Sequence, residues 1–524
     1  MRLTASVAAF LLLSAPLSVR FSEPWSVLRP SVDVVALVGL AAAAKLLAPR
    51  GRSLVMPVLG AALMSAIVYR CAWEVFPRFF GRPLLVKHDL WLLPNLYDLL
   101  FDSLDAWWAG AALVAIAALV ALGFWLSVRL LSLASRPLVG WRRSTAFVLV
   151  AVAAAIVFDG ARESQLLGMS SGLAEAYGFY NNRGTIDHEL ERARSKALGY
   201  PTGLARLQGA DVYVFFIESY GRTLWRNLDY RERFEPFLKQ YDKRLREGGV
   251  HVASHFATSP VKGGGSWLAH ATFQSGVDCD NPVCYERLLD SNLVPLTAYF
   301  RRRGYRTLSV MPAVDIDPSD WPAGDFFQFE EKFWQGAIGY QGPRYDWSPV
   351  PDQYAIQAFR ALRLADAHAA PPVFAELSLT TSHPPFRRVP PYFEGPPVLD
   401  KMLAFYGKTP WLRFDNNYDG FHEAAEGYTT AIRYSLRSVL DFAIAAERPA
   451  LFIVLGDHQP ISTVQGPGGR QVPIHVMSRD RSLIEGFVAW GFRPGLMARG
   501  GSRLHMSGLL EVILSACSLE GGRR

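Results

Sequence analysis

The feature that most restricts the fold of this chain is a set of long apolar stretches, all within the first 160 residues. These stretches occupy 5–19, 32–47, 53–68, 108–128 and 144–157. Most of them approach the roughly 20 residues that an α-helix needs to cross a bilayer. We therefore expect residues 1–160 to form a transmembrane domain of five helices. The first stretch is short enough for a signal peptide, but no clean cleavage site before a polar segment follows it, which favours an uncleaved span.

Basic residues in the short loops predict the orientation of these spans, because loops rich in Lys and Arg stay in the cytoplasm. Lys45, Arg50 and Arg52 lie between the second and third spans, and Arg129, Arg136, Arg142 and Arg143 between the fourth and fifth. We expect a multi-pass protein of the cytoplasmic (inner) membrane, with its remaining residues on the periplasmic or extracellular side. The net charge of +7 fits an anionic membrane surface. No motif predicts a nucleic-acid partner.

The rest of the chain divides into a polar tether, 161–207, and a single larger domain, 208–524. In that domain short apolar runs alternate with helical patterns. The expected strands are 212–217, 306–310, 373–379, 451–455 and 472–477, and the expected helices include 235–247, 295–303, 352–368 and 428–446. Alternating strands and helices are typical of an α/β fold. We expect an extracytoplasmic α/β domain with a mostly parallel, doubly wound sheet.

Two of the expected strands end on side chains that bind metals. The first runs directly into Glu218, and another, more than two hundred residues later, runs into Asp457 and His458. Ligands of open α/β sheets bind just beyond the carboxyl ends of the strands. A helix cap or turn is the alternative role for a lone Asp after a strand. Because two strands end this way, and one adds a histidine, we favour a metal site.

Two further segments carry side chains suited to phosphoryl chemistry. Ser266 follows three glycines, which let the backbone approach a ligand and present the next side chain at a helix start. It is a candidate nucleophile, with an ordinary helix cap as the alternative. His383 follows another strand and is a candidate for contacting a phosphate or acting as general acid, with a turn residue as the alternative.

Together these segments resemble the alkaline phosphatase superfamily, specifically its membrane-anchored sulfatase-like branch of lipoteichoic acid synthases and periplasmic phosphoglycerol or phosphoethanolamine transferases. The resemblance covers the spans followed by an outer domain, and four motifs in their expected order. It implies that Glu218, Asp457 and His458 bind a divalent cation. It also implies that Ser266 is the nucleophile and a further metal ligand, and that His383 contacts the substrate phosphate.

The ligand types and the resemblance lead to a functional hypothesis. Three oxygens and one imidazole suit Mn²⁺ or Zn²⁺, with Mg²⁺ as a third option. The expected enzyme is a phosphotransferase that moves a phosphoglycerol or phosphoethanolamine head group from a phospholipid donor to an envelope glycan or lipid acceptor, through a covalent adduct on Ser266. The alternatives are a phosphodiesterase or phosphatase that uses water, and a non-catalytic envelope-binding protein.

The sequence departs from the family pattern in two places. Sulfatases proper have Pro and Arg two and four residues after the nucleophile, whereas Leu268 and His270 occupy these positions, so sulfatase activity is not expected. Trp321 lies where lipoteichoic acid synthases hold glycerol phosphate, and we expect it to bind substrate. The nearby Arg of those enzymes is replaced by Ala323.

The sequence does not decide the roles of several other residues. Arg344 is a possible replacement for the missing Arg near Trp321. His475 and His505 are candidates for the site, although a structural role is the stronger expectation for each. Cys279 and Cys284 are close enough in sequence for a small-loop disulfide in an exported domain.

Overall fold

The computed structural model divides into two compact units, Met1–Arg78 with Arg82–Asn182, and Phe79–Gly81 with Arg183–Arg524. The structure describes residues 2–18, 31–47, 52–80, 89, 106–135, 183–321, 325–364, 371–414, 421–461, 464, 469–498 and 504–518.

Four helices make up the described part of the first unit. They are α1 (Arg2–Ser18), α2 (Val32–Leu47), α3 (Arg52–Phe80) and α6 (Ala106–Ala134). Within this part, two helical segments are long and apolar enough to cross a membrane, Leu54–Trp73 and Gly110–Ala134. The third predicted stretch ended at residue 68, but its helix continues to Phe80. The fifth, 144–157, lies outside the described residues.

The second unit contains an α/β fold. Its strands are β1 (Asp211–Ile217), β2 (His251–Thr258), β3 (Arg306–Met311), β4 (Glu331–Trp334), β5 (Val373–Leu379), β6 (Arg388–Val389), β7 (Leu412–Arg413), β8 (Ala450–Gly456), β9 (Gln471–Ser478) and β10 (Arg493–Pro494). Its α-helices are α9 (Arg183–Ala197), α10 (Thr223–Arg226), α11 (Leu228–Glu247), α12 (Ser266–Ser275), α13 (Pro282–Leu289), α14 (Leu296–Arg301), α15 (Gln335–Ile338), α16 (Asp352–Arg363), α17 (Leu399–Lys408), α18 (Phe421–Ile444), α20 (Arg481–Val488) and α21 (Leu509–Cys517). Short 3-10 turns occupy Ala205–Leu207, Pro318–Asp320 and Met506–Gly508.

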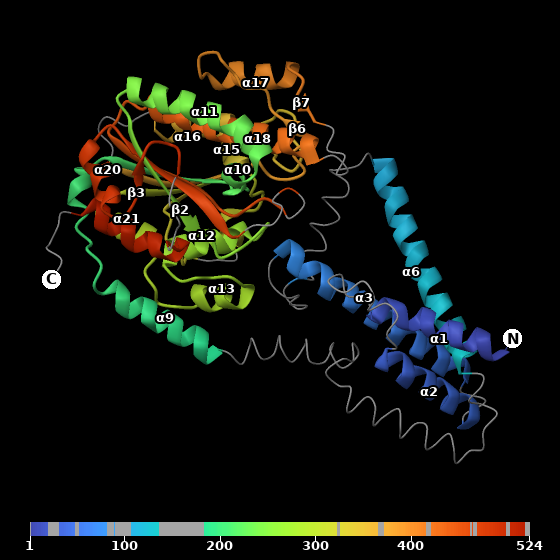
Figure 1. Cartoon of the computed structure of the whole chain (residues 1–524). Helices are drawn as coiled ribbons and strands as arrows, with labels where there is room; N and C mark the ends of the chain where they lie inside the picture. Colours follow the sequence, from blue (N-terminus) through green and yellow to red (C-terminus); the bar gives the residue numbers. More distant parts are fainter. Residues whose placement is uncertain are drawn as a thin grey trace. The chain divides into compact units, whose positions relative to one another are not determined.

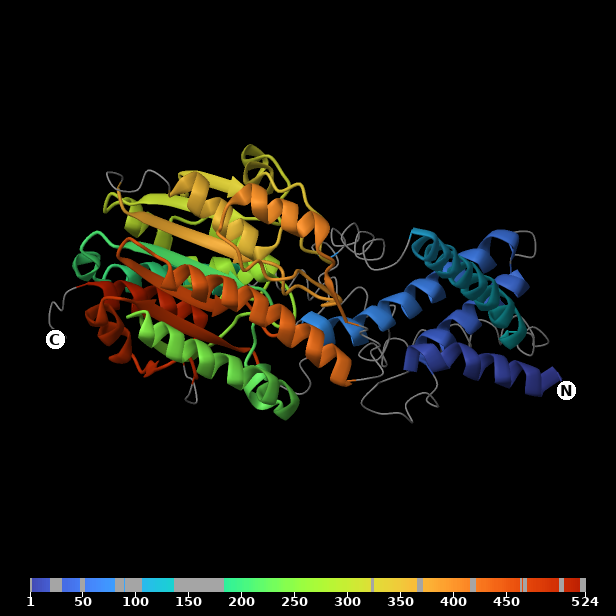
Figure 2. The same cartoon turned by 90° about the horizontal axis from the view of Figure 1, so that it is seen from above.

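Eight strands form one sheet, in the order β10-β2-β9-β8-β1-β5-β3-β4. Helices cover both of its faces, with α11, α16 and α18 on one side and α12, α13 and α21 on the other (Figure 1). Helices α11 and α18 contact each other and run side by side (Figure 2). Every residue of β1 and of β8 is buried, because neighbouring strands and both helical layers surround them. Their continuous apolar sequences follow from burial on both faces.

The sheet is mixed: four of its seven strand pairings are parallel, in line with the prediction of a mostly parallel sheet, and three are antiparallel. Strands β8, β1, β5, β3 and β4 pair in parallel, but β9 is antiparallel to β8, and β2 and β10 continue the antiparallel half. Strand β9 follows β8 after a short segment, 457–470, whereas a parallel neighbour usually needs a helical crossover. The sequence analysis missed β2, since its polar and apolar residues do not form a continuous apolar run.

His475 lies in the antiparallel half and has a structural role. It is fully buried on β9, and its Nδ1 and Nε2 lie 2.6 Å from Ser254 Oγ and 2.9 Å from Tyr220 Oη. The Ser254 hydroxyl donates to the Gly495 carbonyl, so it accepts from Nδ1–H, and Nε2 accepts from Tyr220. The ring is therefore held neutral between strands, and burial lowers its pKa to about 3.

This neutral histidine should make folding sensitive to acid. Because its pKa in the folded chain lies below the unfolded value of about 6.5, protonation favours unfolding, and stability falls as the pH drops from about 6.5 towards 3. Between pH 7 and pH 5 the wild type should lose about 2 kcal/mol more unfolding free energy than His475→Gln. Urea titrations at both pH values measure this difference. The matched control is His251→Gln, at an exposed histidine of β2; equal pH dependence of wild type and His475→Gln contradicts the assignment.

Candidate active site

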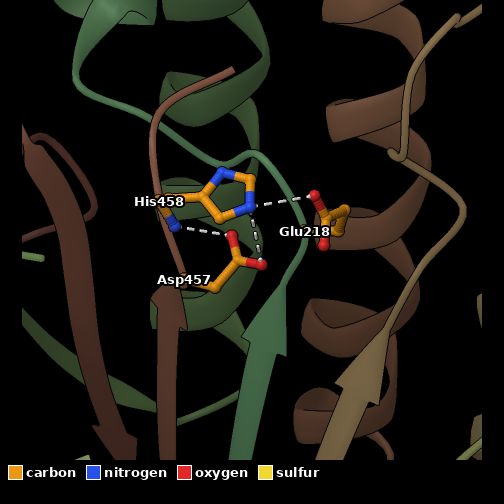
Figure 3. A group of neighbouring side chains, drawn as sticks. All are labelled: Glu218, Asp457 and His458. Atoms are coloured by element: carbon orange, nitrogen blue, oxygen red, sulfur yellow. Dashed lines mark hydrogen bonds and ion pairs between the residues drawn. The ribbon is translucent and has the colours of Figure 1, made fainter. Parts of the chain in front are cut away.

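The predicted metal ligands lie at the carboxyl ends of two neighbouring strands. Strands β1 and β8 pair in parallel, with Ile217 opposite Gly456. Glu218 follows the first strand, and Asp457 and His458 follow the second. Figure 3 shows the three side chains pointing towards one another just beyond the arrowheads of two adjacent strands. The parallel register thus brings together residues that are more than two hundred positions apart in sequence.

The three side chains form a compact, buried group. His458 Nε2 lies 3.3 Å from Glu218 Oε1 and 3.6 Å from Asp457 Oδ2. One ligand atom from each of the three residues lies within 4.8 Å of the other two. His458 Nδ1 donates to the Gln459 carbonyl at 2.7 Å, which leaves the Nε2 lone pair directed towards the carboxylates. A histidine that ligates a metal typically has its second nitrogen held by such a hydrogen bond.

The electrostatics of this group fit a bound cation. Burial and the nearby Glu218 carboxylate raise the pKa of Asp457 to about 7. Burial alone would lower the pKa of His458, but Asp457 and Glu218 outweigh it and raise that pKa. Two buried carboxylates this close together repel each other unless a positive charge lies between them. Two carboxylates and one imidazole are a donor set for a divalent metal ion.

Ser266, from helix α12, belongs to the same group. Its Oγ donates to Glu218 Oε2 at 3.0 Å and lies 3.2 Å from His458 Nε2. Ser266 is the first residue of α12, and the residue before it, Gly265, has φ of 82°. That left-handed conformation suits glycine and turns the chain sharply into the helix. The structure therefore brings together four of the predicted residues: Glu218, Ser266, Asp457 and His458.

A tight turn after β1 supports the acidic ligands. Ser219 has φ of 60°, and its backbone N–H donates to Asp457 Oδ1 at 2.9 Å. The Ser219 carbonyl in turn accepts from Tyr428 Oη at 2.8 Å. The turn passes so close to β8 that a Cβ on Gly456 would lie 1.9 Å from the Tyr220 carbonyl oxygen. Glycine at 456 is thus a requirement of the site's geometry.

Replacing Gly456 with Ala should push this turn away from Asp457. We expect a loss of about 1–3 kcal/mol in unfolding free energy from overpacking, and weaker metal binding because Ser219 no longer holds Asp457. Gly407→Ala near the end of α17 is the matched control, since a Cβ there meets nothing within 4 Å. Thermal unfolding with and without added Mn²⁺ or Zn²⁺ measures both effects. If both variants show the same unfolding temperature and the same response to metal, the close approach of the turn to Gly456 does not position Asp457.

His383 lies in the loop after β5, next to an aromatic side chain that sequence analysis missed. Its ring stacks on Trp347, with centroids 4.3 Å apart and planes 25° apart. Asp346 fixes this arrangement, because its carboxylate accepts from the backbone N–H groups of Arg387 and Arg388. Nothing in the local sequence marks Trp347, since the stacking depends on two loops meeting in the folded domain.

The protonation of His383 follows from its hydrogen bond and its burial. Its Nδ1 lies 2.8 Å from the Pro384 carbonyl, which only accepts, so Nδ1 carries the hydrogen. Burial and, to a smaller extent, the neighbouring His458 lower the pKa of His383 to about 4. The ring is therefore neutral at pH 7, with a free lone pair on Nε2. In this state it accepts a proton rather than donating one.

The remaining predicted residues lie elsewhere in the described structure. Trp321 packs against Trp334, with ring centroids 5.0 Å apart, and no described contact joins it to the four gathered residues. His505 is exposed and pairs with Thr258 through a backbone bridge. Cys279 and Cys284 are buried, free thiols.

The chain matches no protein-family model, and no curated protein matches it. Three of the solved structures to which it is similar are transferases or synthases. One is the integral membrane lipooligosaccharide phosphoethanolamine transferase A (EptA) of Neisseria meningitidis, 13% identical, covering 93% of this chain and 95% of that one, with a TM-score of 0.46. A second is the phosphoglycerol transferase GacH of Streptococcus pyogenes in complex with sn-glycerol-1-phosphate, 11% identical over 64% of this chain and 82% of that one, TM-score 0.38.

The third is the lipoteichoic acid synthase LtaP of Listeria monocytogenes, 13% identical over 51% of this chain, TM-score 0.36. The present chain spans 65% of that protein, less than two thirds of its length. These are the kinds of enzyme that the four sequence motifs resemble. The activity of the present chain is argued below from the residues of its own site.

Proposed function

We propose that this protein is a metal-dependent phosphotransferase that moves a phosphorylated lipid head group onto an envelope glycan or lipid. The observation that carries the proposal is the position of Ser266. Its hydroxyl lies within 3.2 Å of both Glu218 and His458, inside a buried group of metal-binding side chains. An ordinary helix cap does not require two carboxylates and an imidazole around its hydroxyl.

Each residue has a distinct task in this proposal. Glu218, Asp457 and His458 would hold a divalent ion, with Ser266 as the fourth donor. A bound divalent ion would polarise a phosphoryl oxygen and lower the pKa of a nearby hydroxyl. Ser266 Oγ attacks the phosphorus of the donor, forming one P–O bond while the bond to the diacylglycerol oxygen breaks and the Ser266 proton passes to that oxygen. Glu218 Oε2 accepts the hydroxyl hydrogen bond, which orients Oγ for this attack.

The second half of the reaction needs a base for the incoming hydroxyl. We assign this task to His383, because its Nδ1–H is held by Pro384 and its neutral ring has a lone pair on Nε2. The stacked Trp347 restricts rotation of the ring. The acceptor oxygen then bonds to phosphorus as the bond to Ser266 breaks. The acceptor's proton passes to His383, and a proton returns to the released Ser266 oxygen, which restores both side chains. This role replaces that of general acid, which requires a protonated ring.

The membrane helices support a lipid donor. In addition to the α/β unit, the chain includes two segments that are long and apolar enough to span a membrane. A donor that is itself a membrane lipid is always near an enzyme anchored in the same bilayer, so anchoring raises its effective concentration. We infer a catalytic domain on the outer side of the cytoplasmic membrane, where envelope acceptors are found, and phosphatidylglycerol or phosphatidylethanolamine as the donor.

The full-length protein in detergent tests this proposal. Incubation with phosphatidylglycerol or phosphatidylethanolamine, Mn²⁺ or Zn²⁺ and an alkyl glucoside acceptor should release diacylglycerol and give a head-group-modified glucoside. Chelation with EDTA should stop both. Release that is equally fast in water alone, with no modified glucoside, indicates a hydrolase instead of a transferase. If neither lipid yields diacylglycerol while the metal is bound, the proposed donors are wrong.

A further inference from the structure

Helix α12 presents a row of polar side chains to the sheet. Ser266, His270 and Gln274 are four residues apart, so they lie along one side of the helix. His270 and Gln274 are both buried, whereas a helix packed on a sheet usually buries apolar side chains along that side. Ser266 belongs to the metal-binding group, but His270 and Gln274 have no part in the site described above. Buried polar groups need hydrogen-bond partners, and theirs lie in the sheet.

The partner of both side chains is Glu376, a buried carboxylate near the middle of β5. His270 Nδ1 lies 2.6 Å from Glu376 Oε1, and Gln274 Nε2 donates to Oε2 at 2.5 Å. Because a carboxylate only accepts hydrogen bonds, His270 Nδ1 carries the hydrogen. Each oxygen of Glu376 is therefore held by a donor from a different turn of α12.

Two further contacts restrict the same helix. Gln274 Oε1 accepts from the backbone N–H and from the hydroxyl of Thr297 on α14, both at 3.0 Å. The His270 ring packs on Phe216 of β1, with ring centroids 3.9 Å apart. Phe216 lies two residues before Glu218 in the chain. The polar row thus connects α12 to β1, β5 and α14 at the same time.

Hydrogen bonds fix the rotation of a helix more strictly than apolar packing does, because they depend on direction as well as on distance. One residue of an α-helix corresponds to a turn of about 100°. A rotation of α12 by that angle would separate both donors from Glu376 and would move Ser266 away from Glu218. Removing charged groups from water offsets much of what their interaction contributes to stability, and an attested role of such buried groups is to select one arrangement over others.

We propose that His270 and Glu376 are a positioning pair, which fixes the rotation of α12 and so holds Ser266 in the metal-binding group. The inference rests on the proposed function, because it concerns where the proposed nucleophile lies. Neither residue touches the substrate or the ion, and both act through the helix. Loss of the pair should therefore misplace the Ser266 hydroxyl, while the three ligands that follow β1 and β8 stay in place.

The test uses the full-length protein in detergent, loaded with Co²⁺, whose visible absorption spectrum responds to the groups around the ion. His270→Leu fills the space of the ring but removes the donor to Glu376. We expect its spectrum to shift towards that of Ser266→Ala. Its kcat for diacylglycerol release should fall about 100-fold at unchanged KM, the effect of displacing a reacting group by about 1 Å. His270→Asn should keep the wild-type spectrum and most of kcat, because its amide nitrogen lies near the position of Nδ1.

Two more variants separate positioning from stability. Glu376→Gln has one acceptor oxygen instead of two, so it should give the same spectral shift, and it serves as the test where His270→Leu does not fold. Thr272→Val also removes a buried polar group from α12, but the Thr272 hydroxyl accepts from the backbone N–H of Cys279 in the following loop. The spectrum and kcat of Thr272→Val should therefore match those of the wild type.

The outcomes distinguish this inference from the proposed function. The positioning role is overturned if His270→Leu and Glu376→Gln both keep the wild-type spectrum, or if His270→Asn and Thr272→Val show the same losses as His270→Leu. If the wild type binds Co²⁺ but releases no diacylglycerol, the proposed donors are wrong, and the spectra alone still decide whether the pair positions Ser266.

Discussion

Replacing Asp457 with Asn should remove tight binding of Mn²⁺ or Zn²⁺ while leaving the fold intact. In the wild type, Asp457 Oδ1 accepts from the backbone N–H groups of Ser219 and His458 at 2.9 and 2.6 Å. The side-chain oxygen of Asn can keep both hydrogen bonds. The variant loses the negative charge that a divalent ion requires. Removing a residue that only orients a metal ligand usually lowers metal affinity 10–100-fold. Removing a charged ligand itself should therefore lower metal affinity by more than about 100-fold.

Calorimetric titration of the metal-free protein measures this change, and thermal unfolding supplies a second readout. Added metal should raise the unfolding temperature of the wild type but not of Asp457→Asn. Without metal, the variant should be at least as stable as the wild type, because the substitution removes repulsion between Asp457 and Glu218. Asp400→Ala, at an exposed position on α17, is the control. Unchanged affinity in Asp457→Asn excludes this group as the metal site.

Replacing Ser266 with Ala should abolish head-group transfer while metal binding persists. The hydroxyl is the only atom removed, and three charged or imidazole ligands remain. Removing a catalytic nucleophile typically lowers kcat by several orders of magnitude, so we expect a loss of at least about 10⁴-fold. The measurement is release of diacylglycerol per mole of metal-loaded protein.

Ser275→Ala is a matched control for that loss. Ser275 is a buried serine of the same helix, α12, and its Oγ donates to the Ala271 carbonyl one turn earlier. Its replacement should leave transfer nearly unchanged. If Ser266→Ala retains wild-type turnover, then Ser266 is a helix-terminal residue near a metal and not the nucleophile.

The sequence predicted the parallel half of the sheet better than the antiparallel half. Strands β1 and β8 are nearly continuous apolar runs because they are covered on both faces, and β5 is apolar except for Glu376 and Ser378. The predicted bounds of all three strands differ from the observed ones by at most one residue. Strand β2 carries His251, Ser254 and His255 among its apolar residues, so it has no such signature. The direction of β9 depends on its connection to β8, which apolar patterning does not report.

The candidate site shows the same division between local and tertiary information. Glu218 and Asp457 follow buried strands directly, and Ser266 follows a glycine turn, so their positions at one sheet edge can be inferred from sequence. Trp347 stacks on His383 across two loops, and the adjacent Asp346 accepts a hydrogen bond from the loop after β5, a tertiary contact that the local sequence does not report. Trp321 was predicted to bind substrate, and in the structure its described contact is with Trp334; its role in binding stays a prediction.

The most direct test of this account is the mass of the peptide that contains Ser266 after incubation with donor lipid. The full-length, metal-loaded protein is mixed with phosphatidylglycerol or phosphatidylethanolamine without an acceptor, quenched in acid, digested and examined by mass spectrometry. The account predicts a phosphoglycerol or phosphoethanolamine group on Ser266, absent from Ser266→Ala and lost when an acceptor is added. Diacylglycerol release with an unmodified Ser266, or with the adduct on another residue, would contradict it.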